Sequence, residues 1–490
     1  MSCFMPLFML ALSIHAVKIK DIEDIYKIVE ESPGYKLTTV MPKLQENPSD
    51  SSIVYIAYTP TELIVYSKNY QKGISANSRR RDAVAMVKGQ EDNIAIIIAP
   101  YGKGNDVYYI AVNPLGAIYD KMISIFGETE WDGNVKALTE ETEYGWSALL
   151  IIPFNALNYG EVVWGIQICR VISKKGEMQF LFPTTSLNYI EDIAEMKLDF
   201  NYIKKDKNFN FYVMPSVRFS QEDKTNKFTW GGTIRFKQGS KSVLDITYHP
   251  DFSEVDVDMF KFDLRRLPID YPEKRIFFTE GSNYLSMPFP LLRTRNFEKP
   301  LWGVKFFTAT EKVSLISLFI NDASLGNATI IRTTYNPFSS TKIGFYLMNS
   351  EIGYNLSSMD FINYYEKLKL SFSLQASKRL DNNKNLYYVA FERYEKPGLS
   401  LGVSYTSIDS FIISPFNYIL IDFEGIKQVQ SFLHYRYDKS SYTFMPSFIY
   451  NFIQNKFNSE NIYKNYGFFV YLQTTKFPII LFSNIGASFD

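Results

Sequence analysis

Strict alternation of apolar and polar residues after position 208 is the feature that most restricts the fold of this chain. In 209–220 the odd positions are apolar, and the even positions are mostly polar or small. The same period of two recurs in 227–237, 367–377 and 399–407. Because successive side chains of a β-strand point to opposite faces, this period predicts strands with one apolar and one polar face. About fourteen such segments, give or take about two, follow one another to the C-terminus.

Alternation also fits a soluble antiparallel sheet with one wet face, but three features favour a transmembrane barrel over 201–490. The segments have the length of tilted membrane-spanning strands, and Tyr and Phe gather near their ends, as at Tyr335 and Tyr387. The last strand alternates and carries Phe489 next to the C-terminus, which looks like the signal that directs outer-membrane barrels to insertion. Aromatic residues make up 16% of the chain, which suits girdles at two membrane interfaces.

Residues 17–200 follow a different pattern and predict a β-sandwich. Apolar runs such as 93–99 and 147–154 are continuous, and Gly, Pro and Asn turns separate them. Residues 1–16 are interpreted as a signal peptide cleaved near Ser13 or Ala16, although a basic segment is missing, and a buried N-terminal strand is the alternative. Cys169 would then be the remaining cysteine, which argues against an intrachain disulfide and a thiolate metal site.

Charge and motif content exclude several classes of function. Lys+Arg and Asp+Glu are equal at 52 each, so nucleic acid is not an expected partner. The three histidines, His15, His249 and His434, do not form a metal-binding pattern, and no phosphate-binding Gly-rich loop occurs. We expect no cofactor and no metal, with calcium at an Asp-rich segment as an open alternative.

That Asp-rich segment is an insertion at about 249–300, which interrupts the alternation with charges, Phe and Leu. It follows the third predicted strand, 243–248, so it would leave the barrel at the extracellular end if the N-terminal domain is periplasmic. We expect it to fold into the lumen, where its charges pair with one another or with Arg218 and Arg235 of the wall. The lumenal charged cluster comprises Asp251, Glu254, Asp256, Asp258, Asp263, Arg265, Arg266, Glu273, Lys274, Arg275 and Glu280.

Three roles for this insertion stay open. It can be a structural plug held by ion pairs, or an eyelet that selects solutes. A catalytic carboxylate pair, Glu273 with Glu280, is the third possibility, but no spacing in the sequence establishes the geometry that glycoside hydrolysis needs.

The two motifs of the insertion resemble those of a family of uncharacterised bacterial proteins. In that family a domain similar to carbohydrate-binding modules of family 9 precedes an outer-membrane β-barrel. Its motif Asn-Pro-Asp-Phe-Ser-Gln-Val-Glu-Ala-Asp is similar to 249–258 here, and its motif Pro-Glu-Lys-Arg-Pro-Phe-Phe-Leu-Glu-Gly is similar to 272–281. Segments 112–120 and 145–157 resemble parts of the module, although Leu149 stands where the family usually has a carboxylate.

The resemblance implies a carbohydrate ligand, and aromatic faces are the usual device for stacking on sugar rings. Trp131 lies in a polar loop and is the best candidate, followed by Tyr108 and Tyr144. Arg80 and Arg81, in the run Ser-Arg-Arg-Arg-Asp, can contact sugar hydroxyls. A solvated turn in which one Arg pairs with the Asp is the simpler interpretation of that run.

Taken together, these features predict an all-β outer-membrane protein of a Gram-negative-type bacterium: a periplasmic β-sandwich, then an antiparallel barrel with a lumenal charged loop. It would bind glycans or oligosaccharides and either transport or retain them, with outer-membrane lipid as its second partner. A carbohydrate-active hydrolase, with the barrel as scaffold and a role in carbohydrate catabolism, is one alternative. A purely structural secreted β-protein is the other.

Overall fold

The computed structural model describes most of the chain between residues 13 and 488. The residues outside the description are 1–12, 42–46, 88, 103–106, 125–126, 132, 183–192, 205–208, 223–224, 240–241, 251–272, 274, 280, 311, 339, 366–367, 394–397, 410–424, 440–441, 457–458, 460, 475–477 and 489–490.

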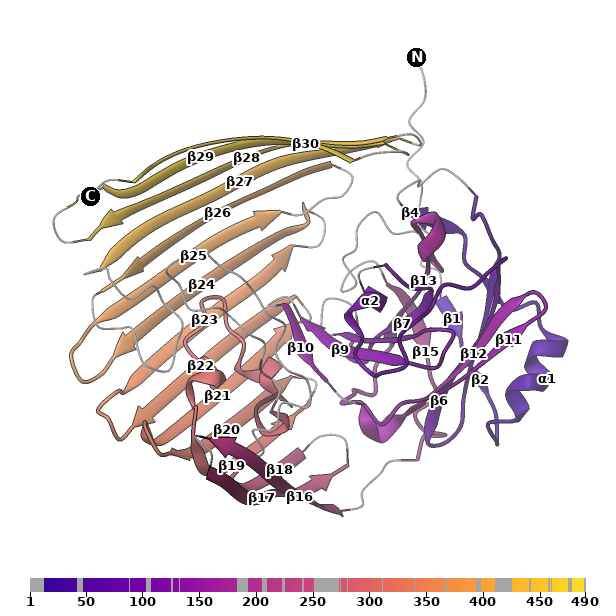
Figure 1. Ribbon diagram of the computed structural model, residues 1–490, viewed down its shortest axis with the longest axis horizontal. Coiled ribbons are helices and arrows are strands. Elements are labelled where there is room, and N and C mark those ends of the chain that lie inside the picture. Colours follow the sequence, from indigo (N-terminus) through magenta and orange to yellow (C-terminus); the bar gives the residue numbers. More distant parts are fainter. Residues whose placement is uncertain are drawn as a thin grey trace. The chain divides into compact units, whose positions relative to one another are not determined.

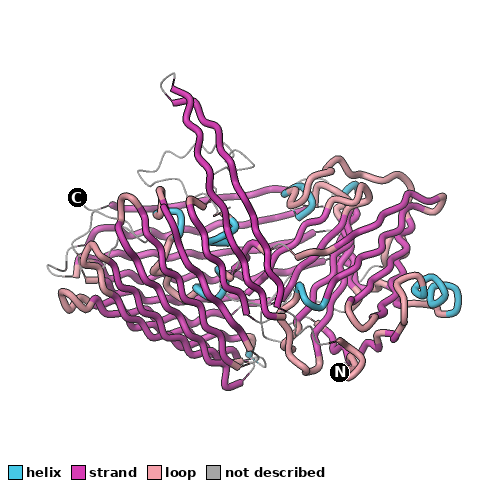
Figure 2. Tube along the Cα trace, turned by 90° about the horizontal axis from the view of Figure 1, so that it is seen from below, coloured by secondary structure: helices cyan, strands magenta, loops and turns pink. Residues whose placement is uncertain are grey.

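The chain separates into two compact units, and strands dominate both (Figures 1 and 2). Unit 1 consists of Met1–Glu128 with Asp132–Lys205, and unit 2 of Thr129–Trp131 with Asp206–Asp490. Within the described residues, no helix is long and apolar enough to span a bilayer.

Unit 1 contains two β-sheets. The first has the order β1-β15-β13-β7-β8-β9-β10, with β14 beside β13 and β4 beside β14. Its strands are β1 (Ser13–His15), β4 (Thr39–Met41), β7 (Asn93–Ala99), β8 (Val107–Val112), β9 (Ile118–Ser124), β10 (Gly127–Glu130), β13 (Trp164–Ile172), β14 (Glu177–Phe180) and β15 (Ala194–Lys197). Ile14 of β1 is buried beside β15, at the place where cleavage of a signal peptide is predicted.

The second sheet has the order β11-β12-β6-β5-β2, with β3 paired to β5. Its strands are β2 (Val17–Lys18), β3 (Tyr35–Lys36), β5 (Ser52–Tyr58), β6 (Glu62–Tyr70), β11 (Lys136–Thr142) and β12 (Gly145–Pro153). Two helices, α1 (Asp24–Glu31) and α2 (Val84–Val87), complete the unit.

The continuous apolar runs of unit 1 are strands that are buried on both faces. Every residue of β7 and β8 is buried. On one face of the first sheet, Ala95 and Ile97 share a cluster with Met86 of α2 and Phe180 of β14. A strand that is buried on both faces has no solvent-exposed face that needs polar residues. Its sequence is therefore a continuous apolar run, whereas the sequence of a half-exposed strand alternates between apolar and polar residues.

Unit 2 is one antiparallel sheet of fifteen strands, a number within the predicted range, and the strands follow one another in sequence order. They are β16 (Phe209–Glu222), β17 (Thr225–Gln238), β18 (Ser242–Tyr248), β19 (Pro300–Ala309), β20 (Val313–Asp322), β21 (Gly326–Phe338), β22 (Thr341–Ser350), β23 (Leu356–Tyr365), β24 (Leu370–Arg379), β25 (Asn385–Arg393), β26 (Gly398–Ile408), β27 (Ile426–Lys439), β28 (Tyr442–Asn455), β29 (Asn461–Thr474) and β30 (Pro478–Ser488). The described order begins at β16 and ends at β30, and the sheet curls strongly (Figure 1).

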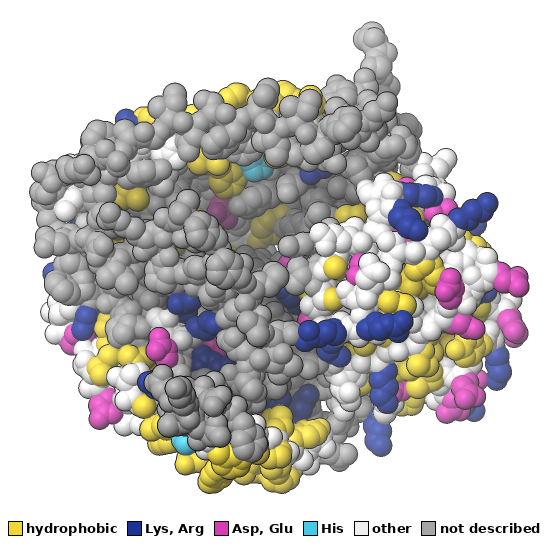
Figure 3. Space-filling view, viewed as in Figure 1, with side chains coloured by type: hydrophobic (Ala, Val, Ile, Leu, Met, Phe, Trp, Pro, Cys, Tyr) yellow, Lys and Arg dark blue, Asp and Glu magenta, His cyan; other side chains and the backbone are white. Residues whose placement is uncertain are grey.

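The period of two places apolar side chains on the outside of this sheet. In β22, Ile343, Phe345 and Leu347 are exposed, whereas the alternating Tyr346 and Met348 are buried. Figure 3 shows apolar side chains gathered over the outer surface around β16–β19, at the lower edge of the view. Exposed large apolar residues of these four strands are Phe209, Phe211, Val213, Val217, Phe228, Trp230, Ile234, Ile246, Tyr248, Leu301 and Trp302.

The described part of the insertion between β18 and β19 lies on the concave side of the sheet, which we call the inner wall (Figure 1). Its described part, mainly residues 273–299, contains the short helix α3 (Ile276–Thr279) and two 3₁₀ turns, Ser282–Leu285 and Thr294–Asn296.

Candidate functional site

Apolar side chains hold the described part of the insertion against the inner wall. Phe277 and Phe278 are buried in one cluster with Ile316, Leu318 and Ile330 of the wall. Further insertion members of the cluster are Leu285, Met287, Leu291 and Phe297. The buried apolar area indicates that the hydrophobic effect carries this part of the contact. Most of the charges that were expected to form ion pairs lie outside the described residues.

Two glycines allow the insertion to approach the wall closely. Gly281, the last residue of the second family-like motif, has a φ of +78°, and a Cβ there would lie 3.1 Å from the ring of Phe307. At Gly303 of β19, a Cβ would lie 3.0 Å from the ring of Phe277. Gly281 therefore explains why the motif ends in glycine: the backbone adopts a left-handed conformation there, beside the ring of Phe307.

Hydrogen bonds attach the insertion at two further points of the wall. Lys305 of β19 donates from Nζ to the carbonyl oxygen of Phe277 at 2.7 Å. Gln375 of β24 accepts from the Phe289 backbone N–H at 2.7 Å and donates to the Phe289 carbonyl at 3.1 Å. Because β19 and β24 are separated by four strands in the sheet, the insertion crosses the concave side.

A row of three buried charges lies on the inner wall beneath the insertion. The ladder places Arg235 of β17, Asp245 of β18 and Lys305 of β19 directly opposite one another. Arg235 donates to both carboxylate oxygens of Asp245, at 2.6 and 2.8 Å, and Lys305 Nζ lies 3.1 Å from Asp245 Oδ2. The Asp245 side chain is 0% exposed and that of Lys305 is 1% exposed, so each charge depends on its partners.

A second buried pair joins Arg332 of β21 and Asp360 of β23 across the strand between them. Arg332 donates to both carboxylate oxygens at 2.7 and 3.0 Å, and both side chains are fully buried. Gly344 of β22 lies opposite Asp360 in the ladder. A Cβ at Gly344 would lie 2.4 Å from Asp360 Oδ2, so the pair requires glycine there.

Glu273 and Arg275 form a local ion pair inside the insertion. Arg275 donates to both oxygens of Glu273 at 2.7 and 2.6 Å, and Thr294 adds a hydrogen bond at 2.8 Å. The guanidinium carbon of Arg275 also lies 4.2 Å from the centroid of the Phe278 ring. Burial would raise the pKa of Glu273, but Arg275 outweighs it and holds that pKa below its ordinary value. A carboxylate held in this way is poorly suited to act as a general acid.

The structure locates only part of the predicted charged cluster. Of its eleven members, Glu273 and Arg275 are described, and the other nine lie outside the described residues. Arg235 pairs with Asp245 on the neighbouring strand, and its expected contact with a carboxylate of the insertion stays a prediction because residues 251–272 lie outside the described residues. Sequence reasoning missed Asp245, Lys305, Arg332 and Asp360, although each occupies a position that points away from the apolar face of its strand.

In unit 1, Arg81 forms an ion pair with a carboxylate outside its own run. Its guanidinium donates to Asp120 at 3.1 and 2.6 Å, and to the carbonyl of Gly133 at 2.7 Å. Burial raises the pKa of the Asp120 carboxyl to about 7, and Arg81 acts against this rise. The expected pairing of one Arg of the run with the neighbouring Asp82 stays a prediction. Arg80 is exposed. The ion pair of Arg81 with Asp120 therefore connects the turn that contains Arg81 to β9.

The other predicted ligand residues lie in different environments. Tyr108 is 4% exposed, and its hydroxyl accepts a hydrogen bond from the Asn158 backbone at 3.0 Å, so it presents no ring face to a sugar. Tyr144 is half-buried in the turn after β11, with its ring centroid 4.7 Å from that of Tyr70. Trp131 is half-buried directly after β10 and is assigned to unit 2.

Tyr144 belongs to a tyrosine cluster on one face of the second sheet, defined by Tyr26, Tyr55, Tyr66, Tyr70 and Tyr144. Tyr66 lies 5.7 Å from Tyr26 of α1 and 6.3 Å from Tyr55 between ring centroids. Tyr26 is 48% exposed, so part of the cluster is accessible. The sequence did not indicate this cluster, because its members come from α1, two strands and a turn.

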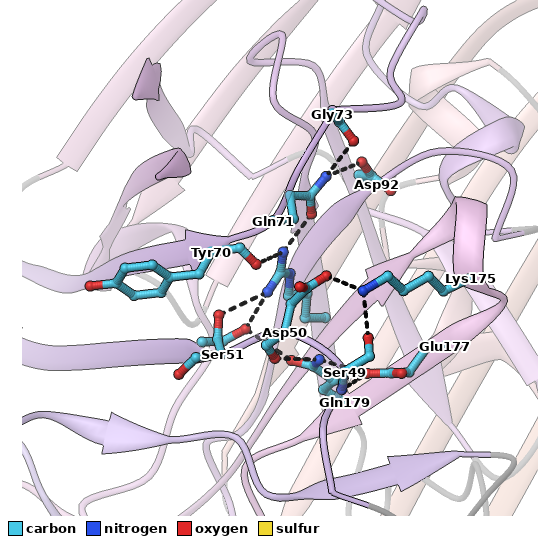
Figure 4. Close-up of polar contacts among 12 residues, drawn as sticks. Ser49, Asp50, Ser51, Tyr70, Gln71, Gly73, Asp92, Lys175, Glu177 and Gln179 are labelled. Atoms are coloured by element: carbon cyan, nitrogen blue, oxygen red, sulfur yellow. Dashed lines mark hydrogen bonds and ion pairs between the residues drawn. The ribbon is translucent and has the colours of Figure 1, made fainter. Parts of the chain in front are cut away.

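A buried arginine links the two sheets of unit 1 (Figure 4). Arg170 of β13 donates to the carbonyl of Ser51 and the hydroxyl of Ser52, at 3.1 and 2.7 Å. It also donates to the carbonyl of Tyr70 and the side chain of Gln71, which in turn donates to Asp92 at 2.6 Å. Burial lowers the pKa of Arg170 to about 10. The network is enclosed, so its role is structural.

Among the residues that the structure describes, no group of three His, Cys, Asp or Glu side chains is arranged to hold a metal ion. The Asp-rich part of the insertion, where calcium was considered, lies outside them.

No family model and no curated protein matches this chain. Solved structures that are similar to this chain include a family 9 carbohydrate-binding module from Caldicellulosiruptor kristjanssonii in complex with glucose. It shares 13% identity at a TM-score of 0.29, and the match covers 38% of this chain and 96% of that chain. OpdQ from Pseudomonas aeruginosa shares 10% identity at a TM-score of 0.31, covering 81% of this chain and 97% of that chain. OpdL from the same organism shares 9% identity at a TM-score of 0.32, covering 78% and 86%. Structural similarity at these identities and TM-scores supports no conclusion about the function of this chain.

Proposed function

We propose that the protein is an outer-membrane β-barrel protein that binds glycans or oligosaccharides and passes them along its inner wall. The observation that carries the proposed location in the outer membrane is the distribution of apolar and charged side chains in unit 2. Its outer face is apolar along strand after strand, whereas charged pairs such as Asp245 with Arg235 are buried on the inner wall.

Water is a poor environment for this outer face. Burying one large apolar side chain is worth about 1.5–3 kcal/mol. Trp230 and Phe209, on the neighbouring strands β17 and β16, are 62% and 66% exposed, and Met359 on the distant strand β23 is 58% exposed. Soluble monomers rarely expose contiguous apolar patches of more than a few hundred Å², so lipid is the environment that suits such a surface.

The lengths of the connections support an orientation. The two longest, 249–299 and 409–425, follow β18 and β26 and leave the sheet at the same rim. The opposite rim has short turns such as 239–241 and 310–312. Outer-membrane barrels have short periplasmic turns and longer extracellular loops. Because β16 runs toward the rim with the long connections, unit 1 joins the barrel at the periplasmic rim.

The glycan part is supported by the resemblance of unit 1 to carbohydrate-binding modules at 112–120 and 145–157 and by the accessible part of the tyrosine cluster. Tyrosine rings offer an apolar face and a hydroxyl, which suit the two kinds of group on a sugar. Trp131 and Arg80 stay candidates for this contact, because neither is buried.

The insertion would act as a constriction of the lumen. It crosses the concave side from β19 to β24, and apolar packing keeps it there. The leading test is planar-bilayer conductance of the full chain. Phe277→Asp places a charge in the apolar cluster and should raise conductance, whereas Leu380→Asp, at an exposed position in a connection, should not. Equal conductance of Phe277→Asp and the parent protein, with both folded, would argue against a constriction.

The location and the ligand need separate experiments. The protein should fractionate with outer membranes and show heat-modifiable gel mobility, and recovery in the soluble fraction would favour a secreted β-protein instead. Full-length protein on a glycan array should retain at least one glycan. Hydrolase activity is the second candidate: it predicts release of reducing ends that Glu273→Gln abolishes. The ion pair of Glu273 with Arg275 favours a structural role for that residue.

A further inference from the structure

The inner wall carries a cavity of about 520 Å³ over strands β25–β29. This volume is within the range of about 300–1,000 Å³ that is typical of small-molecule sites. The register shows that it opens on the inner wall. Glu392 has the same parity as Leu386 of β25, and Leu386 belongs to the cluster that contacts the insertion. Glu392 lies opposite Gly402, Gly402 opposite Phe432, and Phe432 opposite Ile449.

The cavity lining combines apolar surface, such as Phe432 and Ile449, with neutral hydrogen-bonding groups. Amides come from Gln430, Asn451 and Asn465, and hydroxyls from Ser404 and Ser447. Glu392 supplies a carboxylate and His434 an imidazole, and the described lining contains no Lys or Arg. A phosphorylated or carboxylated ligand would find no Lys or Arg there and would meet the carboxylate of Glu392, and a purely apolar ligand would leave the amides without partners.

In this cavity, one aromatic ring packs directly against the backbone of a glycine. A Cβ at Gly402 would lie 2.2 Å from a ring carbon of Phe432, so the ring occupies the space that a side chain would fill. Phe432 is stacked on His434, with centroids 5.4 Å apart and planes at 18°. Glu392 flanks the same glycine on the other side. A carboxylate and an aromatic ring therefore stand on either side of Gly402.

Two polar groups of the lining are buried without a hydrogen-bond partner. These are the hydroxyl of Ser447, a residue that is 3% exposed, and Oδ1 of Asn465. Buried polar atoms almost always have a partner, because an unmade hydrogen bond is costly. Neither atom is accessible from the cavity, so a ligand would pair with them only after the lining shifts.

We propose that this cavity is a subsite for an uncharged sugar ring. The aromatic ring of Phe432 would pack against the C–H face of the sugar, Glu392 would accept hydrogen bonds from hydroxyl groups, and the amides of Gln430 and Asn451 would bind the remaining ones. The proposal rests on the proposed function and deepens it: it adds a sugar site within the barrel to the one expected in unit 1.

The test uses the full-length protein in detergent micelles and ligand-observed NMR with D-glucose, N-acetylglucosamine, maltotriose and cellotriose as probes. Phe432→Ala and the nearly isosteric Glu392→Gln should each weaken binding of at least one probe by about tenfold. The matched control is Tyr435→Ala, which removes an aromatic ring from the outer face of the same strand and should bind as the parent protein does. Heat-modifiable gel mobility verifies that each variant is folded.

The outcomes separate the two proposals. If the parent protein binds a probe and folded Glu392→Gln and Phe432→Ala bind it equally well, the subsite is refuted while glycan binding elsewhere stands. If the parent protein binds no probe and no glycan on the array, glycan binding fails and the subsite fails with it. If Phe432→Ala does not fold, Glu392→Gln decides, because it removes the charge with little change of shape.

Discussion

Asp245→Asn is the sharpest test of how the inner wall is held together. Asp245 is the shared counter-charge of Arg235 and Lys305, and their side chains are 0%, 14% and 1% exposed. Two cation contacts at 2.6 and 3.1 Å are weakened by the neutral amide. At an effective dielectric constant of about 20, one such contact is worth about 4 kcal/mol at about 4 Å. The smaller desolvation cost of the amide offsets part of that loss, so we expect a net loss of about 3–5 kcal/mol in the free energy of unfolding.

The assay is urea-induced unfolding of the full chain in lipid vesicles, followed by tryptophan fluorescence and by heat-modifiable gel mobility. The control is Asp381→Asn, which breaks an exposed pair with Arg379 after β24 and should cost at most about 1 kcal/mol. Lys305→Met should fall between the two, because Asp245 keeps its bidentate partner Arg235. Equal losses for Asp245→Asn and Asp381→Asn would refute the reasoning.

Three further predictions concern single positions. Gly344→Ala would place a methyl group 2.4 Å from Asp360 Oδ2 and should destabilise unit 2 by about 1–3 kcal/mol in the same urea assay, and a neutral result would contradict the close approach. The lowered pKa of Glu273 means that its ion pair stabilises the insertion above the ordinary carboxyl range and is lost as the pH falls through the lowered value; acid should increase protease cleavage of the insertion in the parent protein, with a flatter pH profile in Glu273→Gln. Burial raises the pKa of the Cys169 thiol to about 12, so maleimide should label the peptide containing it after denaturation and not in the folded protein, as mass spectrometry of tryptic peptides would show.

The strands of unit 2 were predictable because their signal is local. Alternation in 209–220 is a property of consecutive residues, and the structure places these residues in β16 with Phe209 and Phe211 exposed on the outer face. The runs of unit 1 were predictable as strands for the same reason. What covers both faces of β7, namely α2 and β14 as well as the other sheet, depends on segments far away in the sequence.

The candidate site was less predictable, because its contacts join distant segments. The motif at 272–281 identified the insertion, and it contains Phe277 and Phe278. Their contacts with Ile316 and Leu318 depend on the register of β18 to β20. The charges of the insertion were expected to pair with one another or with the wall, and the sequence did not indicate that Arg275 pairs with Glu273, two residues away.

The amino-acid sequence of this protein determined which faces of its strands are apolar, because a period of two needs no knowledge of the neighbouring strands. Only the tertiary structure decided which charges meet. Arg332 and Asp360 are 28 residues apart and touch because the intervening strand places Gly344, a residue without a side chain, between them. The same holds for Phe432 over Gly402, since a glycine in the sequence does not reveal which side chain fills the space above it.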